Sequence, residues 1–225
     1  TRPAMPWSTH AAAAIVDHGI AGRVIAVSCD GTGRGGDGAL WGGEFFAGSL
    51  RGFERMAHLA YVPQPGGDSA VREPWRMAAA YLRSVYGPRR LALSRDPLRT
   101  IDAKRRRLVE SLMLKRSLTP LTSSMGRFFD AVGSMVLGRA STSKEAELPM
   151  ALEKIAARGW ADSYPFEVKK SGRVFVIDLA KTVRSIVSDL GRGVEPAIIS
   201  GSFHNTVAEM ILRTCEELRK KAKTS

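Results

Sequence analysis

The sequence predicts an α/β or α+β fold, because strand patterns and helix patterns alternate along its 225 residues. Two short β-branched runs, Arg23–Cys29 (RVIAVSC) and Arg173–Asp178 (RVFVID), are typical of buried strands. Windows with apolar residues at helical spacing lie between them. Hydrophobic residues make up 44% of the chain, which is enough to bury one large core or two modest lobes.

The N-terminal part predicts a helix followed by a hairpin. Ser8–His18 is alanine-rich and has polar capping residues at its start, which favours a helix. The strand Arg23–Cys29 leads into a glycine-dense turn over Asp30–Gly38, and Leu40–Ala47 predicts a second strand. We therefore expect a hairpin with a wide tip.

The middle of the chain is mainly helical by pattern. Gly66 and Gly67 mark a loop, and Pro74 suits the first turn of the helix that follows. The windows that predict helices are Glu73–Tyr86, residues 101–116, and Thr122–Leu137 with Thr122, Ser123 or Ser124 as its cap.

A polar segment, Arg139–Lys144, is the best internal boundary. It predicts a first lobe over 1–138, with the glycine-rich hairpin and a helical insertion, and a second lobe over 139–225. In the second lobe, Glu147–Arg158 and Lys181–Leu190 predict helices, and the last helix is expected to start near His204.

The charge of the chain raises the question of an acidic partner. The formal net charge is +12, and Arg83–Arg116 holds eleven Lys or Arg against three Asp or Glu. A nucleic-acid surface and a solvated helix face or docking surface both fit such a segment. Single-strand binders also need aromatic stacking platforms, and none lies between Pro88 and Arg116. This argues against nucleic acid as the partner.

Cysteine usage and hydropathy point to a reducing compartment. Cys29 and Cys215 are the two cysteines, and neither has the spacing of a disulfide framework or a structural zinc site. No apolar run is long enough to span a membrane, and the N-terminus lacks the layout of a signal peptide. We expect a cytoplasmic protein, and the missing initiator Met suggests an excerpt from a longer one.

The loop that opens at Asp30 is the strongest candidate site. Five glycines lie between Asp30 and Trp41, including Gly31 and Gly33. Glycine lets backbone N–H groups approach an anion closely, and Thr32 adds a hydroxyl donor. Asp30 could ligate a metal or orient a nucleophile. An ordinary hairpin turn explains the glycines equally well, and the pattern is neither a Walker loop nor a Rossmann fingerprint.

Other residues are candidates with simpler alternatives. His10 lies in the first helix, where a lone histidine is usually a surface or capping residue. Arg72 could bind a carboxylate or phosphate, or pair internally with a neighbouring acid. Ser123 and Ser124 could offer donors to an anion at a helix start, or only cap the helix. Asp130 interrupts an apolar helix face and could be solvated or bind a sugar hydroxyl.

Four segments carry a family resemblance, in the family's order and approximate spacing. The chain resembles the HypF carbamoyltransferases of [NiFe]-hydrogenase maturation in DGTGxGxDGxxWGGEF (Asp30–Phe45), GGxxAxREPWRMA (Gly66–Ala78), LTSSMGRxFDAV (Leu121–Val132) and FHNTxAEMI (Phe203–Ile211). The blocks extend across nearly the whole chain.

The resemblance implies a fold and an activity. The fold is that of the actin and sugar-kinase ATPases, with ribonuclease-H-like lobes in which helices flank a mixed sheet. The family makes carbamoyl adenylate from carbamoyl phosphate and ATP, and this domain passes the carbamoyl group to the C-terminal cysteine of HypE. An O-carbamoyltransferase acting on a small molecule is the nearest enzymatic alternative.

The resemblance also implies roles for residues. Asp30 matches a metal-ligand aspartate, the glycines after it match a phosphate-facing loop, and His10 matches the last histidine of a His-His-x-Ala-His motif. Asp130 matches an aspartate that can bind the ribose of ATP or carbamoyl adenylate. A divalent metal, whether zinc, iron or magnesium, would lie between His10 and Asp30. Arg72 and Asp30 are the predicted catalytic residues.

The chain departs from the family at three places. Pro6 stands where the motif has its first histidine, four residues before His10. The family's Glu-Gly-Gln-Ala-Ala reads Glu145-Ala146-Glu147-Leu148-Pro149, which loses a glycine and adds a carboxylate. The family's Ser-Gly-Gly-Val-Phe-Gln-Asn segment does not occur before Ser225. These departures favour a second hypothesis, that the chain is a non-catalytic docking module for HypE or another acidic partner.

Overall fold

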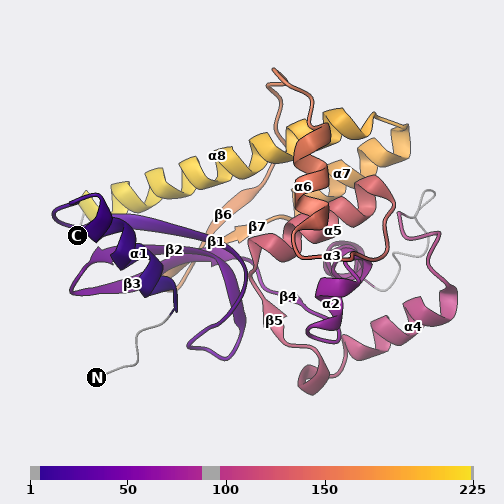
Figure 1. Cartoon of the computed structure of the whole chain (residues 1–225), viewed down its shortest axis with the longest axis horizontal. Helices are drawn as coiled ribbons and strands as arrows, with labels where there is room; N and C mark the ends of the chain where they lie inside the picture. Colours follow the sequence, from indigo (N-terminus) through magenta and orange to yellow (C-terminus); the bar gives the residue numbers. More distant parts are fainter. Residues whose placement is uncertain (1–5, 88–96, 224–225) are drawn as a thin grey trace.

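A seven-stranded mixed sheet organises the chain, with α8 along one face, α1 on the other side of the hairpin, and the remaining helices gathered at one end (Figure 1). The structure, a computed structural model, describes residues 6–87 and 97–223. The strands run in the order β4-β5-β2-β3-β7-β6, and β1 pairs with β2 beside this path. The predicted mixed α/β class, a sheet flanked by helices, is confirmed.

The elements have these bounds. The strands are β1 (Val24–Arg34), β2 (Leu40–Ser49), β3 (Gly52–Leu59), β4 (Val62–Pro63), β5 (Leu121–Thr122), β6 (Glu167–Ser171) and β7 (Val174–Asp178). The helices are α1 (Pro6–Asp17), α2 (Ser69–Arg72), α3 (Trp75–Tyr86), α4 (Ala103–Leu112), α5 (Met125–Leu137), α6 (Glu147–Ile155), α7 (Ala180–Arg192) and α8 (Pro196–Lys223).

The predicted hairpin is present, but its turn is shorter than expected. β1 continues through the first glycines to Arg34, and its register against β2 shifts between Cys29 and Gly33. The expectation of a turn over the whole of Asp30–Gly38 was therefore wrong. Glycines fit an irregular strand as well as a turn, because a bulge needs the same conformational freedom.

The two strands of the hairpin differ in burial. β2 is buried along most of its length because β1 lies on one edge and β3 on the other. β1 was predicted as a buried strand, but its residues are only half buried or exposed. Among the described strands it pairs with β2 alone, so its outer edge is open.

The main core lies where α3, α5, α7 and α8 pack on the sheet. Tyr81, Phe128 and Phe203 stack there with ring centroids 4.9 Å and 5.3 Å apart. The sequence predicts an apolar stripe on α5 of Phe128, Phe129, Val132 and Met135 or Val136. Phe128, Val132, Met135 and Val136 are buried, whereas Phe129 is only partly buried. Strands from both sides of residues 139–144 share the sheet, and the division into two lobes there stays a prediction.

Several boundaries differ from the sequence expectations. The helix predicted over residues 101–116 spans only Ala103–Leu112, with Asp102 as its cap. The helix predicted from Thr122 begins at Met125, because Thr122 belongs to β5. The last helix begins at Pro196 instead of near His204.

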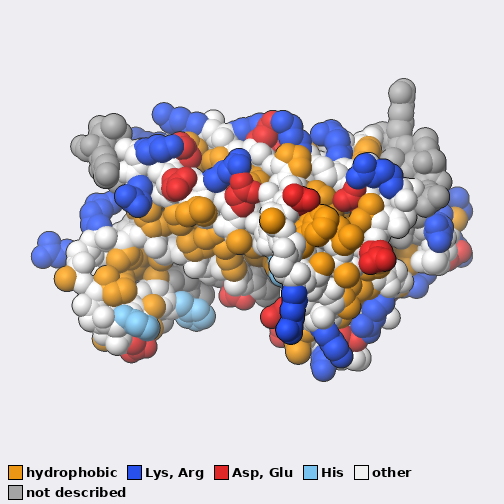
Figure 2. All heavy atoms as spheres, turned by 90° about the horizontal axis from the view of Figure 1, so that it is seen from above, with side chains coloured by type: hydrophobic (Ala, Val, Ile, Leu, Met, Phe, Trp, Pro, Cys, Tyr) orange, Lys and Arg blue, Asp and Glu red, His pale blue; other side chains and the backbone are white. Residues whose placement is uncertain are grey.

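On the surface seen from the α8 side, the Lys and Arg side chains of the described residues do not gather into one patch (Figure 2). Figure 2 shows a band of hydrophobic side chains across this face, with Lys and Arg side chains spread along its margins among Asp and Glu. Part of the basic segment 83–116 lies outside the described residues. No helix within 6–87 and 97–223 has the length and apolar character that a membrane crossing requires.

Candidate functional site

Asp30 lies between two cavities. The first, which we call the α1 cavity, has a volume of about 600 Å³ and lies between α1 and β1. The second, the α5 cavity, has a volume of about 360 Å³ and lies between β1, the start of α5 and the segment before α6. Cys29 and Asp30 line both cavities. The two cavities therefore meet at Asp30, the residue of β1 that the sequence predicted as part of the site.

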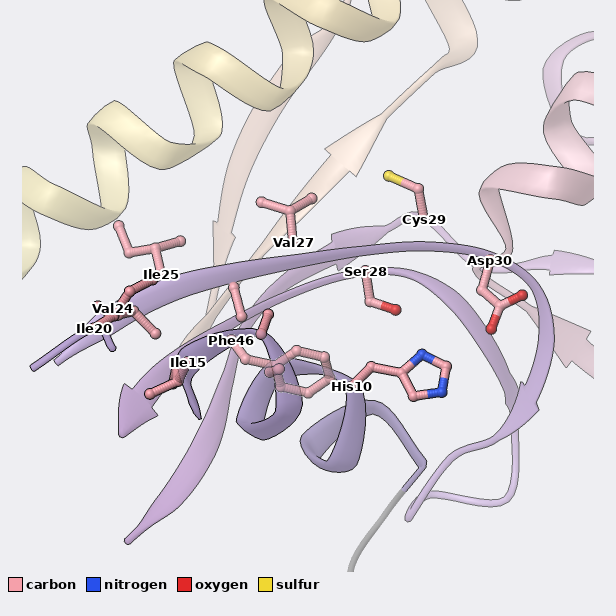
Figure 3. Close-up of a pocket in the computed structure, with 13 residues that line it drawn as sticks. His10, Ile15, Ile20, Val24, Ile25, Val27, Ser28, Cys29, Asp30 and Phe46 are labelled. Carbon is pink, nitrogen blue, oxygen red and sulfur yellow. The ribbon is translucent and has the colours of Figure 1, made fainter. Parts of the chain in front are cut away.

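The α1 cavity brings His10 and Asp30 together. Both line it, and Figure 3 shows their side chains on the same side of β1, together with that of Ser28. Val27 and Cys29 point to the opposite side of the strand, as the alternation of a β-strand requires. The rest of the lining is mainly apolar and includes Ile15 and Phe46.

The donor set at the α1 cavity does not fit a resident metal. Structural and catalytic sites use at least three protein ligands, and His10 and Asp30 supply two. No group of three or more His, Cys, Asp or Glu able to hold a metal occurs within the part of the chain that the structure describes. Proline at position 6 has no side-chain donor. We therefore derive no chemical step through a metal ion.

The α5 cavity is built on close backbone contacts that only glycine allows. A Cβ on Gly42 would lie 2.5 Å from the carbonyl oxygen of Asp30, and one on Gly126 would lie 2.8 Å from the Cα of Gly31. These contacts place the first turn of α5 directly against β1. A Cβ on Gly31 would instead meet only side chains, Arg127 Nη2 at 3.4 Å and Glu145 Oε1 at 3.6 Å.

The serines at the start of α5 are engaged within the protein. The hydroxyl of Ser124 lies 2.7 Å from the carbonyl oxygens of both Asp30 and Gly31, and it accepts a hydrogen bond from the N–H of Arg127. The hydroxyl of Ser123 donates to the carboxylate of Glu44. Both serines thus fasten α5 to the hairpin, and Ser124 is the cap among the three predicted candidates.

A buried ion pair lies in α5 beside this cavity. Arg127 Nη1 and Asp130 Oδ2 are 3.0 Å apart, with side chains 5% and 6% exposed. Among the described residues, neither atom has hydrogen-bond geometry with a partner, and Arg127 Nε has none either. Burial raises the pKa of Asp130 to about 6, against the pull of Arg127, and the nearby Glu145 raises it further. The alternative of a solvated Asp130 is therefore wrong.

The other predicted site residues have more exposed positions. Thr32 is exposed on β1, and Gly33 is half-buried beside it. Arg72 is exposed at the end of α2 and lines neither cavity. The structure thus brings His10, Asp30, Gly31 and Arg127 to one end of the hairpin but leaves Arg72 outside both cavities. The partial burial of the Cys29 thiol raises its pKa, so this thiol stays protonated at neutral pH.

A second group of charged and aromatic side chains connects the hairpin to β3 and to the residues after it, and we call it the hairpin cluster. Glu44 is fully buried and accepts hydrogen bonds from the N–H groups of Gly42 and Gly43 and, at 2.5 Å, from Arg55 Nε. The Arg55 guanidinium lies 3.8 Å above the ring of Trp41. The cluster comprises Asp37, Trp41, Glu44, Arg55 and Tyr61.

Asp37 and Tyr61 complete the hairpin cluster. Asp37 accepts hydrogen bonds from Trp41 Nε1 at 2.8 Å and from the Tyr61 hydroxyl at 2.5 Å. These bonds and the Arg55 charge hold the pKa of Asp37 below its ordinary value, although burial opposes them. Sequence reasoning missed Arg55 and Tyr61, because β3 was not predicted, and it missed Arg127, although this residue lies inside the LTSSMGR segment.

Comparisons with known proteins identify the family of the chain. Residues 26–225 match the family model described as "Carbamoyltransferase, Kae1-like Domain, second subdomain". The chain is 38% identical over 153 residues to Carbamoyltransferase HypF2 of Cupriavidus necator, covering 68% of this chain and 18% of the relative. It is 32% identical to a HypF homolog of the same organism, covering 90% of this chain and 52% of that one.

Solved structures give the same result. A crystal structure of full-length HypF in the phosphate- and nucleotide-bound form superposes with a TM-score of 0.88 at 32% identity, covering 97% of this chain and 34% of that one. HypF of T. kodakarensis superposes with a TM-score of 0.74 at 29% identity, covering 90% and 27%. The chain thus spans about half or less of the length of these relatives. It belongs to the HypF carbamoyltransferase family and matches the second subdomain of its Kae1-like domain.

Proposed function

We propose that this chain forms part of the domain that transfers a carbamoyl group from carbamoyl adenylate to the C-terminal cysteine of HypE. Carbamoyl phosphate and ATP would be the source of the adenylate. The observation that carries the proposal is the α5 cavity, where Gly31 meets the start of a helix. A HypF structure that matches 97% of this chain is phosphate- and nucleotide-bound, which supports a nucleotide ligand here.

The cavity suits the phosphate of the adenylate. The first N–H groups of a helix have no intrahelical acceptor and carry partial positive charge, so the start of α5 favours an anion. Gly31 leaves room for the ligand beside these groups, because it has no side chain. Thr32, Gly33 and Asp130 stay predicted contacts of the nucleotide. Ser123 and Ser124 would contribute by fixing the helix start, since their hydroxyls bond within the protein.

The transfer itself needs only a thiol and a leaving group. The sulfur of the HypE cysteine attacks the carbamoyl carbon and a C–S bond forms. The C–O bond to the phosphate breaks, AMP leaves with that electron pair, and the thiol proton passes to solvent. Asp30 lies where the two cavities meet, so in this scheme it orients the incoming thiol. The role of Arg72 stays a prediction, and Arg72→Ala tests it in the same assay.

A glycine substitution tests the proposal without disturbing the fold. A Cβ on Gly31 makes only ordinary contacts with side chains but fills the space beside the helix start. With carbamoyl adenylate and HypE supplied, we expect the wild-type chain to carbamoylate the C-terminal cysteine of HypE, as read by peptide mass spectrometry. Gly31→Ala should lose this activity and keep its circular dichroism spectrum and melting temperature.

Gly191→Ala is the matched control, because a Cβ there meets nothing within 4 Å. It should retain the wild-type rate. Equal transfer rates for wild type and Gly31→Ala would refute the proposal that the nucleotide binds beside Gly31.

The docking-module hypothesis is the second candidate, and the two-residue donor set at the α1 cavity favours it. It predicts that the chain binds HypE but yields no carbamoylated cysteine, even when carbamoyl adenylate is supplied. Binding by titration calorimetry, measured beside the transfer assay on the same preparation, separates the two functions.

A further inference from the structure

Arg127 directs part of a buried guanidinium at the α5 cavity. The side chain is 5% exposed, yet the residue lines that cavity. Its Nη1 faces Asp130, whereas its Nη2 lies 3.4 Å from the point where a Cβ of Gly31 would be. This nitrogen therefore reaches the space beside Gly31 that a ligand would enter.

The charge of this guanidinium is only partly compensated within the protein. Its Nε and Nη1 have no hydrogen-bond partner in the part of the chain that the structure describes. Asp130, with which it forms an ion pair, has a pKa raised to about 6 by burial, so the negative charge facing Arg127 is incomplete just below neutral pH. A buried cation without full compensation is costly, and an anion that enters the cavity would offset this cost.

Glu145 occupies the same space from the opposite side. Its Oε1 lies 3.6 Å from the Gly31 Cβ position that Arg127 Nη2 approaches to 3.4 Å. Glu145 is exposed and belongs to the segment between α5 and α6, so its side chain can turn toward solvent. An anionic ligand beside Gly31 would meet this carboxylate at short range, and the two would repel each other.

We infer that Arg127 binds the ligand's phosphate through Nη2. In the free protein the Glu145 carboxylate lies in the space beside Gly31, and it competes with the phosphate for that space. This inference rests on the proposed function and deepens it, because it names the residue that recognises the phosphate and a residue that sets its affinity. The phosphate of a nucleotide and that of carbamoyl phosphate share this chemistry.

Titration calorimetry of the full chain with three probes tests the inference. The probes are inorganic phosphate, carbamoyl phosphate and AMP. Glu145→Gln removes the competing charge, and we expect it to bind each probe several-fold more tightly. Arg127→Gln loses a charge-assisted hydrogen bond, and we expect about tenfold or more weaker binding of each probe. A preference for AMP or for carbamoyl phosphate over inorganic phosphate identifies which ligand supplies the group.

Two further variants keep the test decisive. Arg127→Lys keeps the positive charge beside Asp130 but cannot reach Gly31 with a second nitrogen, so it should fold and still bind weakly. Glu153→Gln removes a carboxylate from the exposed side of α6 and should leave all affinities unchanged.

The inference fails if Glu145→Gln does not tighten phosphate binding, or if both Arg127 variants bind every probe as wild type does. In that case the proposed function still stands, provided that Gly31→Ala abolishes transfer. If Gly31→Ala transfers normally, the proposed function fails by itself, whatever the Arg127 variants do.

Discussion

Two groups of charged residues lie at the glycine-rich hairpin, and they differ in how completely their charges are paired. In the hairpin cluster, buried Glu44 has three hydrogen-bond donors in the strands. Arg55 pairs with both Glu44 and Asp37, and among the described residues only its Nη2 lacks a hydrogen-bond partner. Beside the α5 cavity, Arg127 has, within residues 6–87 and 97–223, one ion-pair partner and two nitrogens without hydrogen bonds.

The difference separates a structural role from a binding role. A buried charge that the protein itself pairs adds to a fixed geometry, whereas one left partly unpaired at a cavity can gain a partner from a ligand. The hairpin cluster thus holds β2 and β3 in register beneath the site. The Arg127 group is the part of the molecule that a phosphate can complete.

The largest expected effect is the loss of the pairing in the hairpin cluster. Glu44→Ala removes the buried partner of Arg55, leaving the more exposed Asp37 as its counter-charge, and takes away the acceptor of Ser123. We expect the free energy of unfolding to fall by about 3–5 kcal/mol. Urea denaturation followed by circular dichroism measures this. Glu54→Ala, which removes an exposed carboxylate from the same region, should change stability by less than about 0.5 kcal/mol. Equal denaturation midpoints for the two variants would contradict the assignment of the cluster to the scaffold.

The second effect depends on pH and concerns Asp130. Its pKa is raised from the ordinary value to about 6, so the folded state binds its proton more tightly than the unfolded state does. The stabilisation is fully present below pH 4 and is lost as pH rises through 6, by about 3 kcal/mol at most. Asp130→Asn should remove this loss. Urea midpoints of both proteins from pH 4 to 7 check it, and parallel curves would show that Asp130 titrates normally.

The third effect concerns the close contact between α5, which carries Arg127, and strand β1 of the hairpin. Gly126→Ala places a Cβ 2.8 Å from the Cα of Gly31, so α5 must move away from β1. We expect a loss of about 1–3 kcal/mol in stability and weaker phosphate binding at the same time. Titration calorimetry and urea denaturation measure the two changes. A destabilised variant that binds phosphate normally would show that the contact serves the fold alone.

The smallest effect concerns the segment that carries Glu145. Ala146 has φ of 57°, the left-handed conformation that costs a residue with a Cβ about 1–2 kcal/mol. Ala146→Gly relieves this strain but adds freedom to the unfolded chain, so we expect a net gain of about 0.5 kcal/mol. Thermal unfolding measures it. A lower melting temperature would show that the packing of the Ala146 methyl group outweighs the strain.

The carboxylate of Glu147, by contrast, is paired with residues that do not line the α5 cavity. It is the carboxylate that this chain adds to the family's Glu-Gly-Gln-Ala-Ala segment, and a carboxylate near the cavity is expected to repel phosphate. In the structure it accepts hydrogen bonds from the N–H and hydroxyl of Ser143 and pairs with Arg139. These contacts lower its pKa to about 2. Glu145 is the residue of this segment whose carboxylate lies beside Gly31.

The sequence predicted helices better than strands. α3, α5 and α7 have strong apolar periodicity, and their expected ranges lie within a few residues of the observed ones. β3 was missed because its polar residues Glu54, Arg55 and His58 hide the alternation, and Arg55 and His58 are largely buried only because the hairpin cluster surrounds them. β4 and β5 are two residues long and depend on each other across the fold.

The site was predicted in pieces. The glycine loop and the serines before α5 were each predicted to bind an anion, but Gly31 and Gly126 stand 95 positions apart in the sequence, and no local pattern shows that they touch. Nothing in the sequence distinguished Arg127 from an ordinary charged residue on a helix surface. Its meaning comes from burial and from the position of Gly31, and both are tertiary properties.

The open edge of β1 has a practical consequence for work with this chain alone. Unpaired strand edges let two copies add strand to strand, which is a common route to aggregation. The net charge of +12 makes copies repel each other, but salt screens this repulsion over about 8 Å at physiological ionic strength. Self-association should therefore increase as salt is added, opposite to the behaviour of complexes held by charge. Titrations with phosphate salts will need matched ionic strength if dimers are not to be mistaken for ligand binding.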